Sequence, residues 1–166
     1  MKQFFFYLGF AFLFASCGNT YYIVRHAEKA AQGPNMTSDV PLTEEGKARA
    51  EDLKNILKKK KIAYIYSTNT IRTKSTAQPT ADYFKLPIEM YNPRPDQSFI
   101  DLLKAKTKNT LIVGHSNTVD DIVNMLCGKK KIASDLADAE YDNLFMVKRR
   151  GDRYVFTYQK FGKPAH

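Results

Sequence analysis

Residues 21–28 read Tyr-Tyr-Ile-Val-Arg-His-Ala-Glu, and the fold can be inferred outward from this stretch. Its apolar, β-branched beginning is typical of a buried strand. Arg25 and His26 follow at the end of that strand, so a cation stands next to an imidazole. Open α/β sheets bind ligands just beyond the carboxyl ends of their strands. The stretch therefore predicts a strand that delivers reactive side chains, although an ordinary surface pair at a strand end is the alternative.

Two later stretches repeat this pattern. Residues 110–117 read Thr-Leu-Ile-Val-Gly-His-Ser-Asn, which is again an apolar strand, and it ends on His115. Residues 62–68 form a third apolar run, which ends in Ser-Thr and leads into a segment that carries Arg72. The chain has three histidines, and two of them end predicted strands. We therefore expect His115 and Arg72 to meet the first Arg-His pair at one edge of a sheet.

The rest of the chain alternates between helical and strand patterns, which predicts a single α/β domain. Pro79 lies inside the second expected helix and predicts a kink or a break there. The expected helices are 43–60 with Thr43 as cap, 68–84 with Thr70 as cap, 99–103, and a helix capped by Asn117 or Ser116 and stopped by Gly128. The other expected strands are 87–91 near an edge of the sheet and a hairpin of 144–148 with 154–160.

Length and charge limit the possible functions without choosing one. The chain has 166 residues and a formal net charge of +9, so anionic partners are favoured: phosphorylated substrates, anionic lipid or nucleic acid. The basic runs Lys58–Lys61 and Lys129–Lys131 are most simply interpreted as a solvated helix end and a loop. The sequence shows no zinc-ligand spacing, no glycine-rich phosphate loop and no internal repeat. We therefore expect no metal and no cofactor.

The amino terminus predicts export to the cell envelope. Residues 1–16 have Lys2 followed by a short apolar run, as a secretory signal does. Residues 14–17, Phe-Ala-Ser-Cys, resemble a bacterial lipobox, in which the cysteine is lipidated, so Cys17 is the predicted lipid anchor; plain secretion and an uncleaved anchor are the alternatives. A lipid at Cys17 would lie at the amino end of the first strand, and the site at its carboxyl end would face away from the membrane. Cys127 is expected to be a buried thiol that does not pair with Cys17.

The residue types at the strand ends point to phosphoryl chemistry. A neutral imidazole is a good nucleophile near neutral pH, and adjacent guanidinium groups disfavour the imidazolium. The same guanidinium groups bind phosphate bidentately and stabilise the charge that spreads over a transferring phosphoryl group. The helix that starts near Asn117 can add backbone N–H donors. Two histidines and two arginines can thus hold a phosphoryl group without a metal.

The chain resembles the histidine phosphatase superfamily, which has the phosphoglycerate-mutase-like fold, over nearly all of its length after Thr20. The resemblance is carried by four motifs in order and by the sequence that leads into the last hairpin. These are Arg25-His26-Ala27-Glu28, Leu42-Thr43-Glu44-Glu45-Gly46, the segment from Ser67 through Arg72 to Thr76-Ala77, Gly114-His115-Ser116, and Tyr141-Asp142-Asn143-Leu144-Phe145.

The resemblance implies a three-layer α/β/α sandwich with a mixed, mostly parallel sheet, formed by a domain at 20–162. The final hairpin would supply the one antiparallel strand. His26 would be the nucleophile that forms a phosphohistidine, and Arg25, Arg72 and His115, with Asn117, would bind the phosphate. Many members also use an acid to protonate the leaving oxygen. Asp96 is the favoured candidate here, with Asp101 behind it and Glu28 as the alternative.

The sequence thus predicts an envelope-anchored, metal-independent phosphatase. Its partner would be a phosphorylated small molecule or a phosphoprotein, and no nucleic acid is expected. A phosphoglycerate-mutase-type phosphotransferase is the nearest enzymatic alternative, but mutases of this family are longer and enclose their substrate. A noncatalytic phospho-ligand or protein-binding module on the same fold is the alternative from another class. The intact His26, His115, Arg25 and Arg72 count against it, because a binding module needs no nucleophile.

Overall fold

A six-stranded sheet forms the centre of the molecule. The computed structural model describes residues 18–34 and 37–165. The strand order across the sheet is β3-β2-β4-β1-β5-β6. β3, β2, β4 and β1 run parallel, and β5 is antiparallel to both of its neighbours, β1 and β6. The strands are β1 Thr20–Arg25, β2 Ile62–Ser67, β3 Ile88–Met90, β4 Asn109–Gly114, β5 Asn143–Arg150 and β6 Arg153–Lys160.

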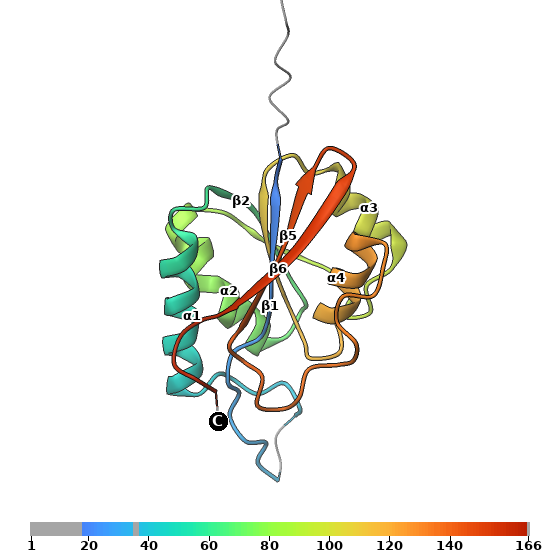
Figure 1. Cartoon of the computed structure of the whole chain (residues 1–166). Coiled ribbons are helices and arrows are strands. Elements are labelled where there is room, and N and C mark those ends of the chain that lie inside the picture. The colour runs from blue at the N-terminus through green and yellow to red at the C-terminus, as the bar shows by residue number, and fades with distance from the viewer. Residues whose placement is uncertain (1–17, 35–36, 166) are drawn as a thin grey trace, which may run out of the picture.

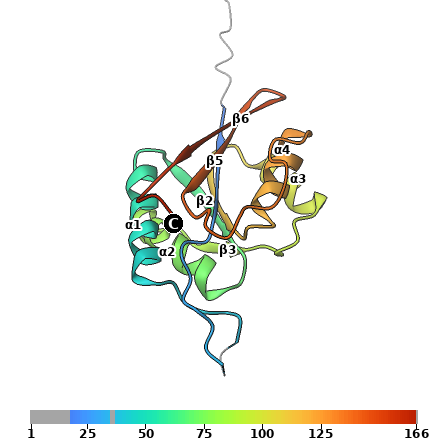
Figure 2. The same ribbon diagram turned by 60° about the horizontal axis from the view of Figure 1, so that its bottom comes forward.

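Within the described residues, four helices cover the sheet, two on each face (Figure 1). They are α1 Glu44–Leu57, α2 Ile71–Phe84, α3 Gln97–Ala105 and α4 Val119–Cys127. α1 and α2 lie on one face, and α3 and α4 on the other, which a second view also shows (Figure 2). The expected three-layer α/β/α sandwich, with a mixed sheet and one antiparallel strand in the final hairpin, is confirmed.

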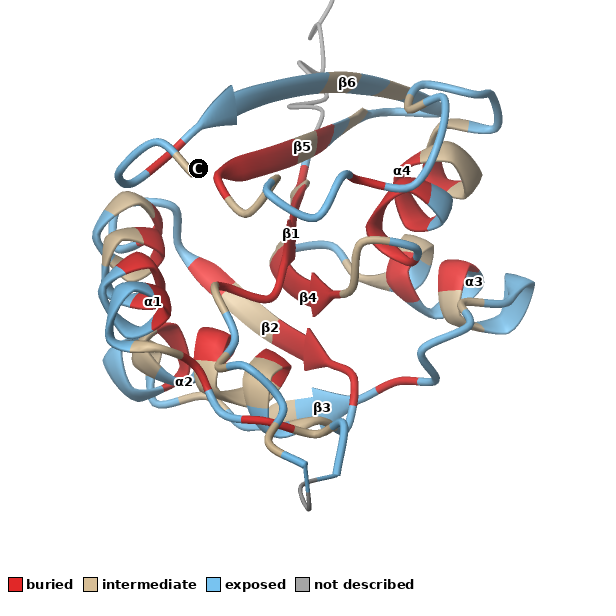
Figure 3. Cartoon of the chain, turned by 90° about the horizontal axis from the view of Figure 1, so that it is seen from below, coloured by how far each residue is buried: buried red, intermediate tan, exposed pale blue. Residues whose placement is uncertain are grey.

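β1 is buried on both faces (Figure 3) and therefore contributes side chains to two separate parts of the core. Tyr21 and Ile23 pack with α4, whereas Tyr22 and Val24 pack with α1 and α2. Successive side chains of a strand point to opposite faces, so the continuous apolar run of β1 fills both layers. β1 and β4 are neighbours, yet α1, which follows β1, and α4, which follows β4, lie on opposite faces. The point where the chain leaves these two strands in opposite directions is where open α/β sheets bind ligands.

Several local signals in the sequence hold, and others give way to tertiary contacts. Thr43 caps α1 by accepting from Gly46 N at 3.0 Å, as expected, but the helix ends at Leu57 and not near residue 60. Thr70 caps α2 as expected. A kink or a break was expected at Pro79. α2 continues through this position, so the helix is not broken there.

The expected cap of α4 is wrong. The helix begins at Val119, and Ser116 and Asn117 lie in the turn before it. This turn is closed by His115 O, which accepts from Thr118 N at 3.1 Å and from Val119 N at 3.2 Å. Thr118 occupies the cap position, but its hydroxyl donates to Pro93 O, so no side chain caps this helix.

The ends of the described chain bear on two further expectations. The predicted signal at 1–16 and the predicted lipidation site Cys17 lie outside the described residues. Cys127 is a free thiol at the end of α4, and it is half-buried where full burial was expected; burial raises its pKa. Among the helices that the structure describes, none is long and apolar enough to cross a lipid bilayer.

Candidate active site

His26 lies immediately after β1, at the switch point between β1 and β4. Its backbone N–H donates to Gly114 O at the end of β4, at 2.8 Å, which continues the parallel ladder by one residue. The next residue, Ala27, donates its N–H to the Thr76 hydroxyl on α2 at 3.0 Å. Backbone contacts on both sides therefore fix the imidazole, which is only 3% exposed.

One nitrogen of the His26 ring is hydrogen-bonded, and among the residues that the structure describes the other nitrogen has no hydrogen-bond partner. Nδ1 lies 2.8 Å from Ala27 O. A carbonyl oxygen can only accept, so Nδ1 carries the proton and Nε2 keeps its lone pair. The pKa of His26 is lowered to about 3, chiefly by burial and further by the charges of Arg25 and Arg72. The arginines were expected to keep this ring neutral, but desolvation is the larger cause. The ring is thus a neutral nucleophile.

The depressed pKa of His26 predicts a pH-dependent stability. The unfolded chain has a His26 pKa near 6.5 and binds more protons than the folded chain below that pH. The contribution of His26 is therefore complete above about pH 6.5 and is lost as the pH falls toward about 3. Urea unfolding should show the wild type losing about 2 kcal/mol relative to His26→Gln between about pH 6.5 and about pH 5. Parallel stability curves for the two proteins would contradict the assignment.

His115 lies beside His26 and is held by a chain of hydroxyl groups. The two ring centroids are 5.5 Å apart. Nδ1 of His115 is 3.4 Å from Arg72 Nη2, and Nε2 is 2.8 Å from the Thr68 hydroxyl. Arginine can only donate, so Nδ1 accepts and Nε2 carries the proton that Thr68 accepts. Thr68 in turn donates to the Thr73 hydroxyl at 3.0 Å, and Thr73 donates to Thr68 O at 2.8 Å. Burial, with the nearby arginines, lowers the pKa of His115 to about 4.

Because Thr68 fixes the tautomer and orientation of His115, its hydroxyl should matter for catalysis although it lies behind the ring. Thr68→Val is nearly isosteric and leaves the Nε2–H of His115 without an acceptor. We expect kcat/KM to fall about tenfold, which corresponds to 1.4 kcal/mol, while Thr68→Ser keeps most of the activity. Steady-state kinetics on the three proteins tests this expectation. Equal losses in Val and Ser variants would point to packing by the methyl group instead.

Arg25 ends β1 and is almost fully buried. Its Nη1 donates to Ala137 O at 2.8 Å and to Asp138 O at 3.0 Å, and its guanidinium carbon lies 4.1 Å from the centre of the Tyr141 ring. The Tyr141 ring also lies 5.9 Å from the His26 ring. The loop before β5 thus clamps Arg25 next to the nucleophile. Tyr141 stands in one of the sequence motifs, but the motif alone predicts no role for it.

Arg72 lies in the first turn of α2 and reaches back to the strand ends, as expected. Its Nη1 donates to Ser38 O at 3.2 Å and lies 3.6 Å from the Asp39 carboxylate. The same carboxylate accepts from Ile71 N at 2.8 Å, so it ties the start of α2 to the loop after β1. Sequence analysis missed Asp39, and only its place shortly before the Leu42-Thr43 motif signals it.

Both arginines keep donors that an anion can use. A guanidinium carries five N–H donors. Within the described residues, Arg25 uses three of them, on Ala137 O, Asp138 O and the Tyr141 hydroxyl, and Arg72 uses two. The buried Nε atoms of both residues have no partner there. The unused donors of both groups, next to two neutral imidazoles, make this edge of the sheet suited to a phosphoryl group.

Asp96, the favoured acid, is placed as a helix cap. Its carboxylate accepts from Phe99 N at 3.0 Å and from the Ser98 hydroxyl at 2.6 Å at the start of α3. These bonds lower the pKa of Asp96, and the side chain is exposed. Within the described chain no bond joins it to His26 or His115. The geometry therefore gives Asp96 a structural role and does not favour it as a proton donor.

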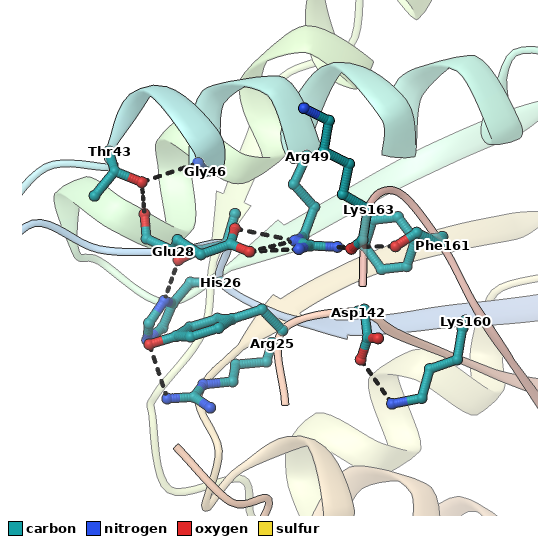
Figure 4. A network of polar contacts seen from close by, with 12 residues as sticks. Arg25, His26, Glu28, Thr43, Gly46, Arg49, Asp142, Lys160, Phe161 and Lys163 are labelled. Carbon is teal, nitrogen blue, oxygen red and sulfur yellow. Dashed lines mark hydrogen bonds and ion pairs between the residues drawn. The ribbon is translucent and has the colours of Figure 1, made fainter. Parts of the chain in front are cut away.

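Glu28, the alternative acid, forms a buried ion pair (Figure 4). Its carboxylate accepts from Arg49 Nε at 2.8 and 2.9 Å and from Nη2 at 2.5 Å. Arg49 Nη1 donates to Phe161 O and Lys163 O, so the pair ties α1 to the loop after β1 and to the segment after β6. Arg49 was missed in the sequence. The feature of the sequence that could have revealed it is a charged residue on the buried side of α1, between Gly46 and Leu53.

Asn117 is exposed in the turn between β4 and α4, and no hydrogen bond from its side chain is present among the described residues. It lies two residues after His115, so its contact with a phosphate stays a prediction. Within residues 18–34 and 37–165, no cluster of three His, Cys, Asp or Glu side chains is arranged to hold a metal ion.

Comparison with known proteins identifies what the chain is similar to. Residues 21–92 match the family model of the histidine phosphatase superfamily, branch 1. Three solved structures share the fold. They are the protein histidine phosphatase SixA complexed with tungstate (20% identity, TM-score 0.67, 86% of this chain and 96% of that one), the putative phosphohistidine phosphatase SixA from Agrobacterium tumefaciens (21%, 0.63, 88% and 99%), and the phosphoserine phosphatase of Entamoeba histolytica with 3-phosphoglyceric acid (17%, 0.64, 87% and 97%). No curated protein sequence matches the chain significantly.

Proposed function

Residues 21–92 match the model of the histidine phosphatase superfamily, and on that premise we propose that the chain hydrolyses phosphomonoesters without a metal, through a phosphohistidine on His26. The observation that carries the proposal is the tautomer of His26. Its Nδ1–H is bonded to Ala27 O, so the lone pair is on Nε2, in a ring that is neutral at physiological pH. A binding site has no need for such a nucleophile.

The reaction would proceed in two steps. Nε2 of His26 attacks the phosphorus, the bond from phosphorus to the leaving group breaks, and its electron pair leaves with that group. Water then attacks the phosphorus of the phosphohistidine, and the N–P bond breaks to release inorganic phosphate and the neutral imidazole. The Nδ1–H bond to Ala27 O keeps the ring oriented through both steps and stabilises the positive charge of the phosphorylated ring.

Arg25, Arg72 and His115 would bind the phosphoryl oxygens. The guanidinium donors that are not used within the protein stabilise the charge that develops on the equatorial oxygens. An anion that takes over the donor of Arg72 releases Nδ1 of His115 from its 3.4 Å contact. The negative charge of the phosphate then raises the pKa of His115, which becomes able to donate a proton to the phosphate.

The proposed substrate class follows from the finding that neither candidate carboxylic acid is placed to protonate the leaving group. Both residues that the sequence suggested as the acid make other contacts: Asp96 caps a helix, and Glu28 forms an ion pair with Arg49. We therefore propose substrates whose leaving group departs without strong protonation by a carboxylic acid, such as aryl phosphates and phosphoramidates. Phosphohistidine, after which the Agrobacterium tumefaciens protein is named, belongs to the second class, which supports this choice.

A noncatalytic phospho-ligand or protein-binding module is the alternative from another class. It is favoured by the finding that neither candidate acid is placed to protonate a leaving group. A phosphoglycerate-mutase-type phosphotransferase is the enzymatic alternative. The three readings differ in what they do with a phosphoryl group: the phosphatase passes it to water, the mutase passes it to a second substrate, and the binding module leaves it in place.

The test uses the full chain treated with a chelator. We expect turnover of p-nitrophenyl phosphate and, with a labelled substrate and a rapid quench, a covalent label that is stable in alkali and labile in acid, as a phosphohistidine is. If turnover is seen without a trapped label at one temperature, the proposal still requires the label to appear at a lower temperature, where its hydrolysis is slower. A folded chain that binds phosphate but neither turns over nor becomes labelled, with aryl phosphate and with phosphohistidine, would contradict the proposal and favour the binding module.

A further inference from the structure

Positive charge collects at the end of the molecule opposite His26. Twelve of the 26 lysines and arginines lie in loops and element ends at the amino ends of the parallel strands, and we call this set the basic end. The stretches 58–61, 104–108 and 148–153, which carry all of these cations except Lys85, contain one acidic residue, Asp152. The members are Lys58, Lys59, Lys60, Lys61, Lys85, Lys104, Lys106, Lys108, Lys148, Arg149, Arg150 and Arg153.

Backbone and side-chain contacts bring these segments to one place. Asn109 joins two of them, because its side chain accepts from Thr20 N at 2.8 Å and donates to Lys60 O. Asn19 joins two more, because its O accepts from Arg149 N at 2.8 Å and its side chain donates to Lys108 O. These contacts gather the segments around the start of β1, at the end of the sheet where the turn between β5 and β6 lies (Figure 1).

The charges of the basic end are not neutralised within the described chain. All six ion pairs there involve other cations, namely Arg25, Lys47, Arg49, Lys54, Arg72 and Lys160. Most of the twelve side chains are exposed. Lys104, Lys106 and Arg149 are half-buried, but the other nine are exposed and could be replaced at little cost to stability, so folding does not explain this surface of like charges that repel one another. This surface is therefore suited to an anionic partner.

Gly18 lies in the middle of this surface. It lines two hollows, one with Lys61 and Lys108 and the other with Lys148, Arg150 and Arg153. It lies so close to the backbone of Arg149 that a Cβ on it would be 2.5 Å from Arg149 O. The residue before Gly18 is Cys17, the predicted lipidation site.

We propose that the basic end docks on the surface of a membrane that contains anionic phospholipids, next to the lipid anchor predicted at Cys17. Three residues, Gly18 to Thr20, join this cysteine to the rest of β1, and they span about 10 Å at most. That reach is close to the Debye length of about 8 Å at physiological salt, so an anchored chain has its basic end within range of the headgroups. Each cation held there strengthens binding roughly fivefold.

Docking in this way fixes the orientation of the candidate active site. β1 has six residues and spans about 20 Å from Thr20 to Arg25. His26 follows Arg25, so the candidate active site lies at the end of the sheet that faces away from the lipid. The docked chain presents this site to soluble or peripheral substrates and not to the lipids beneath it.

The experiment compares binding of the full chain to vesicles of phosphatidylcholine alone and of phosphatidylcholine with phosphatidylglycerol. The apolar residues 4–15 contribute to both, so the ratio of the two affinities isolates the effect of charge. We expect at least a tenfold preference for the anionic vesicles at low salt, which disappears at high salt. The combined variant Lys59→Glu, Lys108→Glu, Arg153→Glu should lose this preference.

A matched variant separates a local surface from net charge. Lys47→Glu, Arg94→Glu, Lys163→Glu makes the same change in net charge at exposed cations away from the basic end, and it should keep the preference. Equal losses in the two variants would overturn the proposal, because net charge alone would then explain binding. No preference in the wild type would overturn it as well. Tighter binding to a short DNA duplex than to anionic vesicles at the same salt would replace the membrane with nucleic acid.

Discussion

His26→Ala should lower kcat/KM for p-nitrophenyl phosphate by at least about 10⁴-fold and remove the covalent label. The imidazole of His26 is the nucleophile of the first step, and no other group of the site can take over this role. The neighbouring imidazole of His115 keeps its Nε2–H on Thr68. In the proposed mechanism its Nδ1 is protonated once the phosphate is bound, so neither nitrogen then offers a lone pair. Residual activity would come only from binding and electrostatic stabilisation by the arginines.

The matched control is His115→Ala. His115 touches the phosphate in the proposed mechanism but forms no covalent bond, so its loss should cost less, about 10²-fold, and the label should still form. Thermal unfolding of both variants checks that the fold remains, since His26 is buried and His115 is partly exposed. A labelled His26→Ala protein, or equal losses of activity in the two variants, would remove His26 from the role of nucleophile.

The elements that the sequence predicted best are those with a strong local signal. β1 ends on Arg25, and β2 and β4 are each followed directly by a residue of the candidate site, Thr68 and His115. The parallel pairing that brings these ends together follows from the alternation of strands and helices. Positive φ at Gly128 and Gly151 agrees with the predicted helix stop and hairpin turn. These features depend on residues that are close in sequence or on general rules of topology.

The features that could not be predicted depend on contacts between distant residues. Asp96 has the residue type of an acid and equally that of a helix cap, and only its bond to Phe99 N distinguishes the two. The hydroxyl chain behind His115 requires the geometry of the turn between β2 and α2, which residue spacing does not give. The partner of Glu28 is 21 residues away on α1, so the motif alone does not reveal the ion pair.

That ion pair leads to a second large effect: Arg49→Leu should destabilise the protein by about 3–5 kcal/mol. The variant leaves the Glu28 carboxylate, whose side chain is 13% exposed, without its cation. It also removes the donor to Phe161 O and Lys163 O, which holds the segment after β6. Since domains are stable by only about 5–15 kcal/mol, urea unfolding should show a large shift of the midpoint. Lys54→Leu, on the exposed side of α1 and paired with Glu51, is the control and should cost less than about 1 kcal/mol.

Glu28→Gln then separates the structural role of this residue from an acid role. Gln keeps the size and one acceptor oxygen, so a structural role predicts a loss of stability of about 1–3 kcal/mol. The ratio of kcat/KM for an alkyl phosphate to that for an aryl phosphate should not change, because both substrates use the same folded site. An acid role predicts the opposite pattern: the alkyl substrate, whose leaving oxygen needs a proton, would lose at least about 10²-fold relative to the aryl one. The ratio is independent of the fraction of protein that is folded, so it decides between the two roles even when the variant is unstable.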